Sequence, residues 1–279
     1  MKKCEIFFIL LSVAALFSCN TNSNKESKSD NTVNSAVPEN PVVVQQPAGV
    51  PVNISGSIPL DSNIQDSPIL DYSMELEPIV LNNSTATAKA VNALSYAITG
   101  TEYGDLGTAC DAQVKRLTAK FQELRPDYID IRENYDDAFW PDNHYYVKGV
   151  CEKGYKGYEN YILNYDEYEG GAHGYYYTAV HTFDPRDGHE VILDEIMKEG
   201  YEEELLHAIA AGILRYCKAS DITELDWLQH GTGELFISKN AVLRDSCITF
   251  IYNPYEIASY AAGKIEADIT YEELKHILK

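Results

Sequence analysis

Residues 145–183, YYVKGVCEKGYKGYENYILNYDEYEGGAHGYYYTAVHTF, decide the fold of this chain. Three runs within this stretch are rich in tyrosine and alternate in polarity, which is typical of β-strands: 145–152, 158–168 and 175–183. Gly170-Gly171 lies between the second and third runs and favours a turn there. We therefore predict neighbouring antiparallel strands.

Ten tyrosines fall between Tyr145 and Tyr177, and strand alternation directs them to both faces of the predicted sheet. One face should be core, where each tyrosine needs a hydrogen-bond partner for its hydroxyl. The other face would be an exposed aromatic surface, suited to stacking on sugar rings or to anchoring a protein partner. The alternative interpretation is that these tyrosines only cover a half-solvated sheet.

Helices are predicted on both sides of this stretch. Residues 85–99 are rich in alanine and end before Gly100, residues 108–124 carry one apolar stripe and end before Pro126, and residues 201–218 carry another such stripe. Further strands are predicted at 70–76, 234–238, 247–253 and 265–269, and a short helix from Tyr271. Runs of antiparallel strands with helices between them indicate the α+β class: tyrosine-rich antiparallel sheets packed with a few helices, in two intertwined subdomains.

The charge balance excludes one large class of proteins. The 279 residues include 22 Lys+Arg and 43 Asp+Glu, so the net charge is −21. A nucleic-acid binder needs a basic surface, which such a chain lacks, and adsorption to anionic lipid headgroups is disfavoured for the same reason. A basic protein, a cation or a neutral glycan fits the charge.

The first nineteen residues have the features of an export signal. Lys2 and Lys3 precede a mostly apolar segment, 6–17, which is shorter than the ~20 residues that a membrane-spanning helix needs. Leu16-Phe17-Ser18-Cys19 resembles a bacterial lipobox, which implies removal of residues 1–18 and lipid attachment to Cys19; an ordinary secretory signal is the alternative. We expect a lipid-anchored protein of the bacterial cell envelope, at the outer membrane and facing the periplasm or the surface.

Residues 19–66 are predicted to form the lipidated cysteine and a flexible tether. Residues 20–66 contain five of the eleven prolines and no aromatic residue, a composition that cannot offset its ordering entropy by burial. We expect truncation at Ser67 to leave a folded body. Alternatively, part of residues 42–58 adds an edge strand to that body.

Four cysteines remain beyond Cys19: Cys110, Cys151, Cys217 and Cys247. In an exported protein they can form two disulfides, and three pairings are open. Free buried thiols are the alternative. Their wide spacing contains no C-x-x-C pair, which argues against a zinc site.

Three motifs carry a family resemblance. They are YDEYEGGAHG at 165–174, TFDPRDGHEVILDEI at 182–196, and FIYNPYEIASYAAG at 250–263 with ITYEEL at 269–274. Their order resembles the paired domains of unknown function DUF4163 and DUF3298, which implies a DUF4163-like domain at 67–170 and a DUF3298-like domain at 171–279. Ser259 replaces the proline that usually stands at that position in the family.

The resemblance implies a binding or sensing module. Related domains form the extracytoplasmic part of an anti-sigma factor that senses lysozyme by binding it, and precede the catalytic domain of a peptidoglycan deacetylase. The paired aspartates and His-x-x-x-His of that catalytic domain are absent from this sequence, because no two histidines stand four residues apart.

Several motifs for catalysis or metal binding are incomplete. His189-Glu190 begins like a zinc-protease H-E-x-x-H helix, but Leu193 stands where the second histidine is needed. Asp184, Asp187 and Glu190 lack the EF-hand spacing, so a solvated turn is the better interpretation. No G-x-S-x-G motif for a serine nucleophile is present. We predict no catalytic residue, metal or cofactor.

The main hypothesis is therefore a non-catalytic binding module, whose partner is a lysozyme-like protein or a peptidoglycan-type glycan. The candidate ligand-binding residues are Glu169, His173, Tyr175, Tyr177, Asn253 and Tyr255. One alternative is a polysaccharide-acting enzyme that uses Glu169, Asp166 and His173, because an acid and a histidine flank the Gly-Gly turn. The structural alternatives are a histidine that only supports this turn, a rigid corner at 253–256, and a purely structural lipoprotein.

Overall fold

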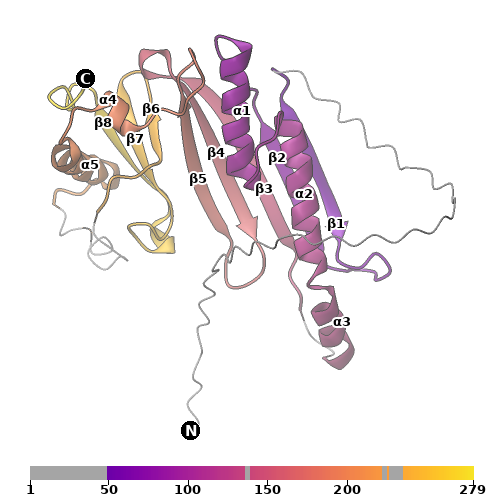
Figure 1. Cartoon of the computed structure of the whole chain (residues 1–279). Coiled ribbons are helices and arrows are strands. Elements are labelled where there is room, and N and C mark those ends of the chain that lie inside the picture. The colour runs from indigo at the N-terminus through magenta and orange to yellow at the C-terminus, as the bar shows by residue number, and fades with distance from the viewer. Residues whose placement is uncertain (1–48, 136–138, 222–224, 226–234) are drawn as a thin grey trace, which may run out of the picture. The chain divides into compact units, whose positions relative to one another are not determined.

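The computed structural model describes residues 49–135, 139–221, 225 and 235–279. The predicted export signal, Cys19 and tether residues 20–48 lie outside these ranges. Two sheets and their covering helices confirm the α+β class (Figure 1). The larger sheet has its strands in chain order: β1 (Val52–Pro59), β2 (Ile69–Leu76), β3 (Asn143–Lys153), β4 (Glu159–Tyr168) and β5 (Tyr175–Phe183).

The three tyrosine-rich runs are β3, β4 and β5, and they pair antiparallel as predicted. The expectation of wholly antiparallel sheets is wrong at one place, because β2 and β3 are parallel. Parallel neighbours need a long crossover, and residues 77–142 supply it. This crossover contains α1 (Ser84–Thr99), α2 (Leu106–Gln122) and α3 (Arg125–Asn134).

Side chains and glycine define the ends of these helices. Asn83 accepts a hydrogen bond from the Ala86 backbone N–H at 2.9 Å at the start of α1, and Gly100 ends that helix in the left-handed conformation. Asp105 caps α2 in the same way, by accepting from the Thr108 N–H at 2.7 Å. Helix α3 is missing from the sequence-based prediction, which ends a helix before Pro126, whereas proline also suits a first helical turn.

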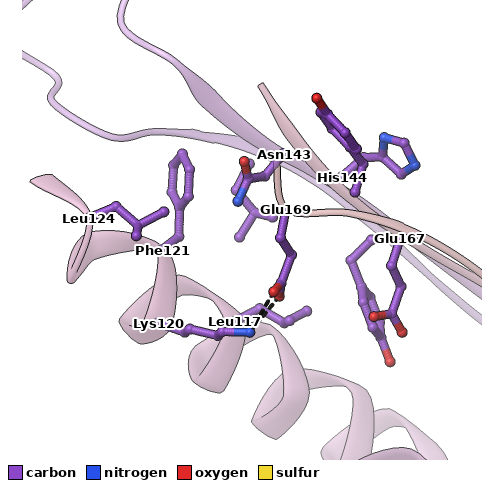
Figure 2. A pocket seen from close by; sticks show the side chains of 11 residues that line it. Leu117, Lys120, Phe121, Leu124, Asn143, His144, Glu167 and Glu169 are labelled. Carbon is purple, nitrogen blue, oxygen red and sulfur yellow. Dashed lines mark hydrogen bonds and ion pairs between the residues drawn. The ribbon is translucent and has the colours of Figure 1, made fainter. Parts of the chain in front are cut away.

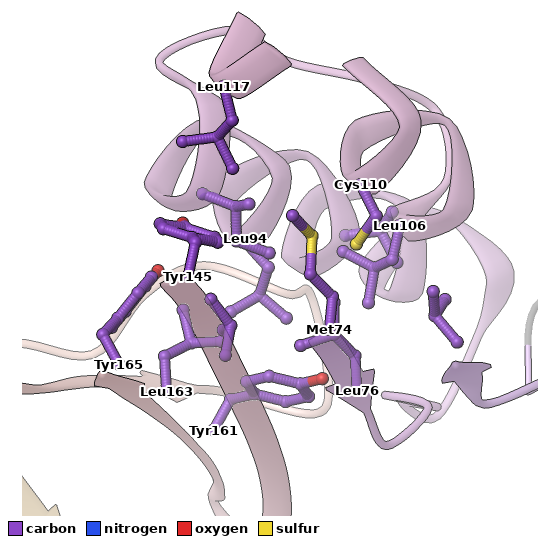
Figure 3. Close-up of a cluster of buried hydrophobic side chains, with 14 of the residues drawn as sticks. Met74, Leu76, Leu94, Leu106, Cys110, Leu117, Tyr145, Tyr161, Leu163 and Tyr165 are labelled. Carbon is purple, nitrogen blue, oxygen red and sulfur yellow. The ribbon is translucent and has the colours of Figure 1, made fainter. Parts of the chain in front are cut away.

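The main core lies between α1, α2 and the larger sheet (Figure 3). Leu94 and Leu106 from the helices contact a layer that includes Met74 of β2 and Leu163 of β4, all of them buried. Full burial of each such side chain contributes about 1.5–3 kcal/mol. Tyr161 also points into this core, and its hydroxyl donates to the Glu77 carbonyl at 2.6 Å.

Strand β1 corrects the prediction of a tether that extends to residue 66. It pairs with β2 along its whole length, from Val52 opposite Leu76 to Pro59 opposite Ile69. Val52 and Leu60 are buried in the main core. The structure therefore confirms the alternative prediction, in which part of residues 42–58 adds an edge strand to the folded body.

A chain that begins at Ser67 should be less stable than one that begins at Gly49. It loses β1 and the buried side chains of Val52 and Leu60, so we expect the free energy of unfolding to fall by about 3–6 kcal/mol. Urea unfolding of the two truncated chains measures the difference. Equal urea midpoints would show that β1 contributes nothing to stability.

The smaller sheet follows along the chain and contains β6 (Ala241–Leu243), β7 (Cys247–Tyr252) and β8 (Ile265–Thr270). Helix α5 (Glu202–Cys217), predicted at 201–218, packs on this sheet through Ile209 and Ile213, and α4 (Leu193–Ile196) precedes it. The predicted strand at 234–238 is wrong for its described part, 235–238, since the short strand begins at Ala241. Turns replace the helix expected from Tyr271.

Buried asparagines join the two sheets. Asn160 of β4 donates to the Leu243 carbonyl at 3.0 Å and accepts from the Leu243 N–H at 3.1 Å. In the same way, Asn253 donates to the carbonyl of Thr178 in β5 at 3.0 Å and accepts from the Thr178 N–H at 2.7 Å. Each side-chain amide thus pairs with backbone groups as a neighbouring strand would.

Each sheet is formed by a continuous part of the chain. The larger sheet takes its strands from 52–183 and the smaller from 241–270, and the described residues within 43–279 form one compact unit. The predicted domain boundary at 170/171 falls inside the β4–β5 hairpin, whose strands pair from Glu167 opposite Tyr175 onward.

The four cysteines are free thiols, as in the second of the two alternatives. Cys110 is buried on the inner face of α2, and the other three are half-buried on separate elements. Within the described ranges, no helix is both long and apolar enough to cross a membrane.

Candidate functional site

Strand alternation separates the candidate residues at the β4–β5 turn onto two faces of the larger sheet. Tyr177 faces the helices, where its ring lies parallel to that of Tyr165 with 4.3 Å between the centroids. Tyr176 faces the other way and contacts Tyr260 edge to face, with centroids 5.6 Å apart. The two faces are described in turn.

On the helix-covered face, Glu169 is held by an ion pair. Its carboxylate accepts from Lys120 Nζ of α2 at 2.6 Å, at the rim of a small pocket (Figure 2). Glu167 lies on the same face and accepts from the Tyr177 hydroxyl at 3.2 Å. Burial raises the pKa of Glu167 above its ordinary value. Tyr175, whose ring lies 5.4 Å from that of Tyr177, is exposed at the edge of this group.

On the opposite face, four rings form a surface that we call the aromatic platform: His173, Tyr176, Tyr255 and Tyr260. The His173 ring stacks on Tyr260, with centroids 4.0 Å apart and planes at 22°. The Nε2 atom of His173 lies 3.1 Å from the Tyr255 hydroxyl, and its Nδ1 lies 2.8 Å from the Gly174 carbonyl. Nδ1–H donates to the carbonyl, which can only accept, and the Tyr255 hydroxyl can either donate to Nε2 or accept from it.

A rigid corner presents Tyr255 on the platform. Tyr255 has a φ of 72°, a left-handed conformation that non-glycine residues rarely adopt. The corner around it is closed by three hydrogen bonds: from Tyr255 N–H to the Ala258 carbonyl at 3.0 Å, from Glu256 N–H to the Asn253 carbonyl at 3.1 Å, and from Asn253 N–H to Glu256 Oε2 at 2.7 Å. The Tyr255 side chain is 46% exposed. The backbone strain is thus associated with an exposed aromatic ring.

The structure brings together only part of the predicted set. His173 and Tyr255 meet on the platform, whereas Glu169, Tyr175 and Tyr177 lie on the other face. Asn253 is buried, and the oxygen and the nitrogen of its side-chain amide both bond to the Thr178 backbone, so its role is structural.

Two platform residues, Tyr176 and Tyr260, were not predicted as candidates. Tyr176 could have been found from alternation, since it points opposite to Tyr175 and Tyr177. Tyr260 belongs to the quoted motif at 250–263, five residues after Tyr255, but only the fold reveals its contact with His173.

The three residues of the enzymatic alternative have separate partners. Glu169 pairs with Lys120, Asp166 with His144 Nε2 at 3.1 Å, and His173 with Tyr255. The geometry therefore gives no support to a shared acid–base site.

Each carboxylate of the acidic turn at 184–190 is already bonded to a nearby arginine or histidine. Asp184 binds Arg186, which lowers the pKa of that carboxyl to about 2. Asp187 Oδ1 lies 2.6 Å from His189 Nδ1, and Glu190 Oε1 lies 2.7 Å from His181 Nδ1. In the parts of the chain that the structure describes, no three His, Cys, Asp or Glu side chains are grouped so as to hold a metal ion.

Comparison with known families finds a match in the C-terminal part of the chain. Residues 194–272 match the model of DUF3298, a family described as protein of unknown function. The match runs from α4 to just beyond β8, so the platform takes Tyr255 and Tyr260 from the region that is similar to DUF3298 and takes His173 and Tyr176 from the preceding hairpin. The likeness of residues 67–170 to DUF4163 stays a prediction.

Two solved structures have the same fold. A DUF3298 family member from Bacteroides fragilis NCTC 9343 is 23% identical, with a TM-score of 0.73 over 82% of this chain and 92% of its own. A DUF3298 family protein from Pseudomonas aeruginosa PAO1 is 17% identical, with a TM-score of 0.53 over 84% and 96%. No curated protein matches the sequence. At these identities the structures support the fold and not a particular ligand.

Proposed function

We propose that this protein is a non-catalytic binding module of the bacterial cell envelope, anchored by a lipid on Cys19, and that the aromatic platform contacts its ligand. The observation that carries the proposal is the stacking of His173 on Tyr260, at 4.0 Å, together with the bond from Tyr255 to the same imidazole. These contacts join two motifs that lie far apart in the sequence into one partly exposed surface.

The chemistry of the platform favours binding over catalysis. Tyrosine and histidine rings offer flat apolar faces and polar tips, which suit both stacking on sugars and anchoring of a protein partner. Among the described residues, the partners of the imidazole are a carbonyl and a hydroxyl, and none is a carboxylate that would make an acid–base pair with it. The ligand classes that fit are a lysozyme-like protein and a peptidoglycan-type glycan.

The two ligand classes differ in how strongly their binding should depend on charge. With a net charge of −21, the chain attracts a basic protein such as lysozyme, and that attraction weakens as salt screens it. Stacking of a neutral glycan on the platform is almost independent of salt. The salt dependence of binding therefore identifies the partner class.

Replacing both Tyr255 and Tyr260 by alanine should weaken ligand binding by about 30-fold or more, as expected for the loss of aromatic hot spots worth at least 2 kcal/mol. The measurement is calorimetry of residues 20–279 with lysozyme and with soluble peptidoglycan fragments, each at two salt concentrations.

Tyr96→Ala provides the matched control, because Tyr96 is also an exposed tyrosine but lies on α1. This variant should bind as the parent chain does. The proposal fails if neither probe binds, or if the platform variant and the control bind equally well.

A further inference from the structure

A cavity of about 310 Å³ lies on the helix-covered face of the larger sheet, next to the pocket in Figure 2. The cavity is lined by residues of α1 and α2 on one side and of β3, β4 and β5 on the other. Its volume is at the lower end of the range of small-ligand sites, about 300–1,000 Å³. It is separate from the aromatic platform, which faces the other way.

The inner end of the cavity is made of buried polar side chains. Gln113 is 2% exposed, and Tyr145 and Tyr165 are each 5% exposed. Gln113 accepts from Arg116 Nε at 2.9 Å, which fixes its amide. Figure 3 shows Tyr145 and Tyr165 side by side beneath Leu117.

The Tyr165 hydroxyl is open to the cavity. The described residues contain no buried side-chain oxygen or nitrogen without a hydrogen-bond partner, and none of them forms a hydrogen bond with the Tyr165 hydroxyl. This oxygen therefore reaches the solvent of the cavity, although Tyr165 as a whole is almost fully buried. The hydroxyl is thus available to a molecule within the cavity.

The charges around the cavity are balanced. Arg116 and Lys120 stand opposite Glu167 and Glu169, and Lys120 already pairs with Glu169. A bound ion of either sign meets charges of both signs, whereas a neutral molecule with several hydroxyls can donate to the carboxylates and accept from the guanidinium.

The lining of the cavity supplies the remaining feature. Its exposed surface is almost wholly polar, and it includes Tyr165 and Tyr177, whose rings stack on each other. A polar lining suits a ligand that carries several hydroxyl groups. We propose that this cavity binds one neutral sugar residue, with Glu167, Arg116 and the Tyr165 hydroxyl as its hydrogen-bond partners. This site goes beyond the function proposed above and does not depend on the platform.

The test uses residues 20–279, which include every described residue. Maltotriose and tri-N-acetylglucosamine serve as neutral probes, and trigalacturonic acid and glucosamine as charged ones. Saturation-transfer NMR detects binding, and calorimetry measures affinity. We expect at least one neutral probe to bind and to be preferred over both charged sugars.

Tyr165→Phe is the decisive variant, because it removes only an oxygen that makes no bond within the described protein. We expect its thermal midpoint to be unchanged and its affinity for the neutral sugar to fall about fivefold or more. Glu167→Gln keeps the shape of the side chain, removes a partly buried charge, and should weaken binding about tenfold.

Tyr96→Ala is the control, because Tyr96 is an exposed tyrosine that lines neither the cavity nor the platform, and it should leave sugar affinity unchanged. The inference is overturned if neither neutral probe binds, if only charged sugars bind, or if Tyr165→Phe retains the parent affinity. Loss of sugar binding in Tyr260→Ala but not in Tyr165→Phe also overturns it, while supporting the platform as the glycan site.

Discussion

Replacing Asn160 by alanine should lower the free energy of unfolding by about 3–5 kcal/mol. The side chain is fully buried and forms three hydrogen bonds: two with the backbone of Leu243, and a third accepted from the Thr182 hydroxyl at 2.8 Å. The alanine variant leaves all three partner groups buried without their bonds, and each costs about 1–3 kcal/mol, which partial access of water reduces. The loss should be visible as a lower urea midpoint.

Asn164→Ala is the matched control for this variant. Asn164 stands on the same strand and faces the same side, but it is half-buried and accepts one bond, from the Thr178 hydroxyl at 3.0 Å. We expect a cost of about 1 kcal/mol there. If both asparagine variants unfold at the same urea concentration, the side chain of Asn160 does not hold the two sheets together as we describe.

Gly188→Ala should destabilise the protein by about 2–5 kcal/mol, as the sum of backbone strain and overpacking. Gly188 has a φ of 77°, and a Cβ added there would lie 2.1 Å from the Ala86 carbonyl oxygen in the first turn of α1. The turn after β5 therefore packs so closely on α1 that no side chain fits between them. Thermal unfolding measures the effect.

Gly200→Ala separates the two causes. Gly200 has almost the same φ, 78°, but a Cβ there meets nothing within 4 Å. Its cost should be the backbone strain alone, about 1–2 kcal/mol. Equal destabilisation by the two variants would mean that the contact between Gly188 and α1 has no energetic weight.

Local sequence signals predicted most of the secondary structure. Alternating tyrosines marked β3, β4 and β5, Gly100 marked the end of α1, and an apolar stripe marked α2. The pairing of distant elements was harder to predict. The parallel β2–β3 pair and the edge strand β1 depend on residues far apart in the chain, and the alternation within one strand does not name its neighbour.

The candidate site was predicted in part for the same reason. His173 and Tyr255 were each singled out in their own motif, but 82 residues separate them and only the docking of the two sheets brings them together. Glu169 and His173 are close in sequence, yet the intervening Gly-Gly turn leaves them with partners on different faces. Asn253 was expected to bind a ligand, and its buried amide binds Thr178 instead.

The central claim is that His173 of the hairpin and Tyr260 of the region similar to DUF3298 act as one binding surface. A double-mutant cycle tests it most directly, with the affinity of residues 20–279 for lysozyme and for peptidoglycan fragments measured in His173→Ala, Tyr260→Ala and the combined variant. Since the two rings stack at 4.0 Å, we predict a coupling of about 0.5–3 kcal/mol, so that the second substitution costs much less than the first. Additive losses, or affinities unchanged by both substitutions, would contradict the account.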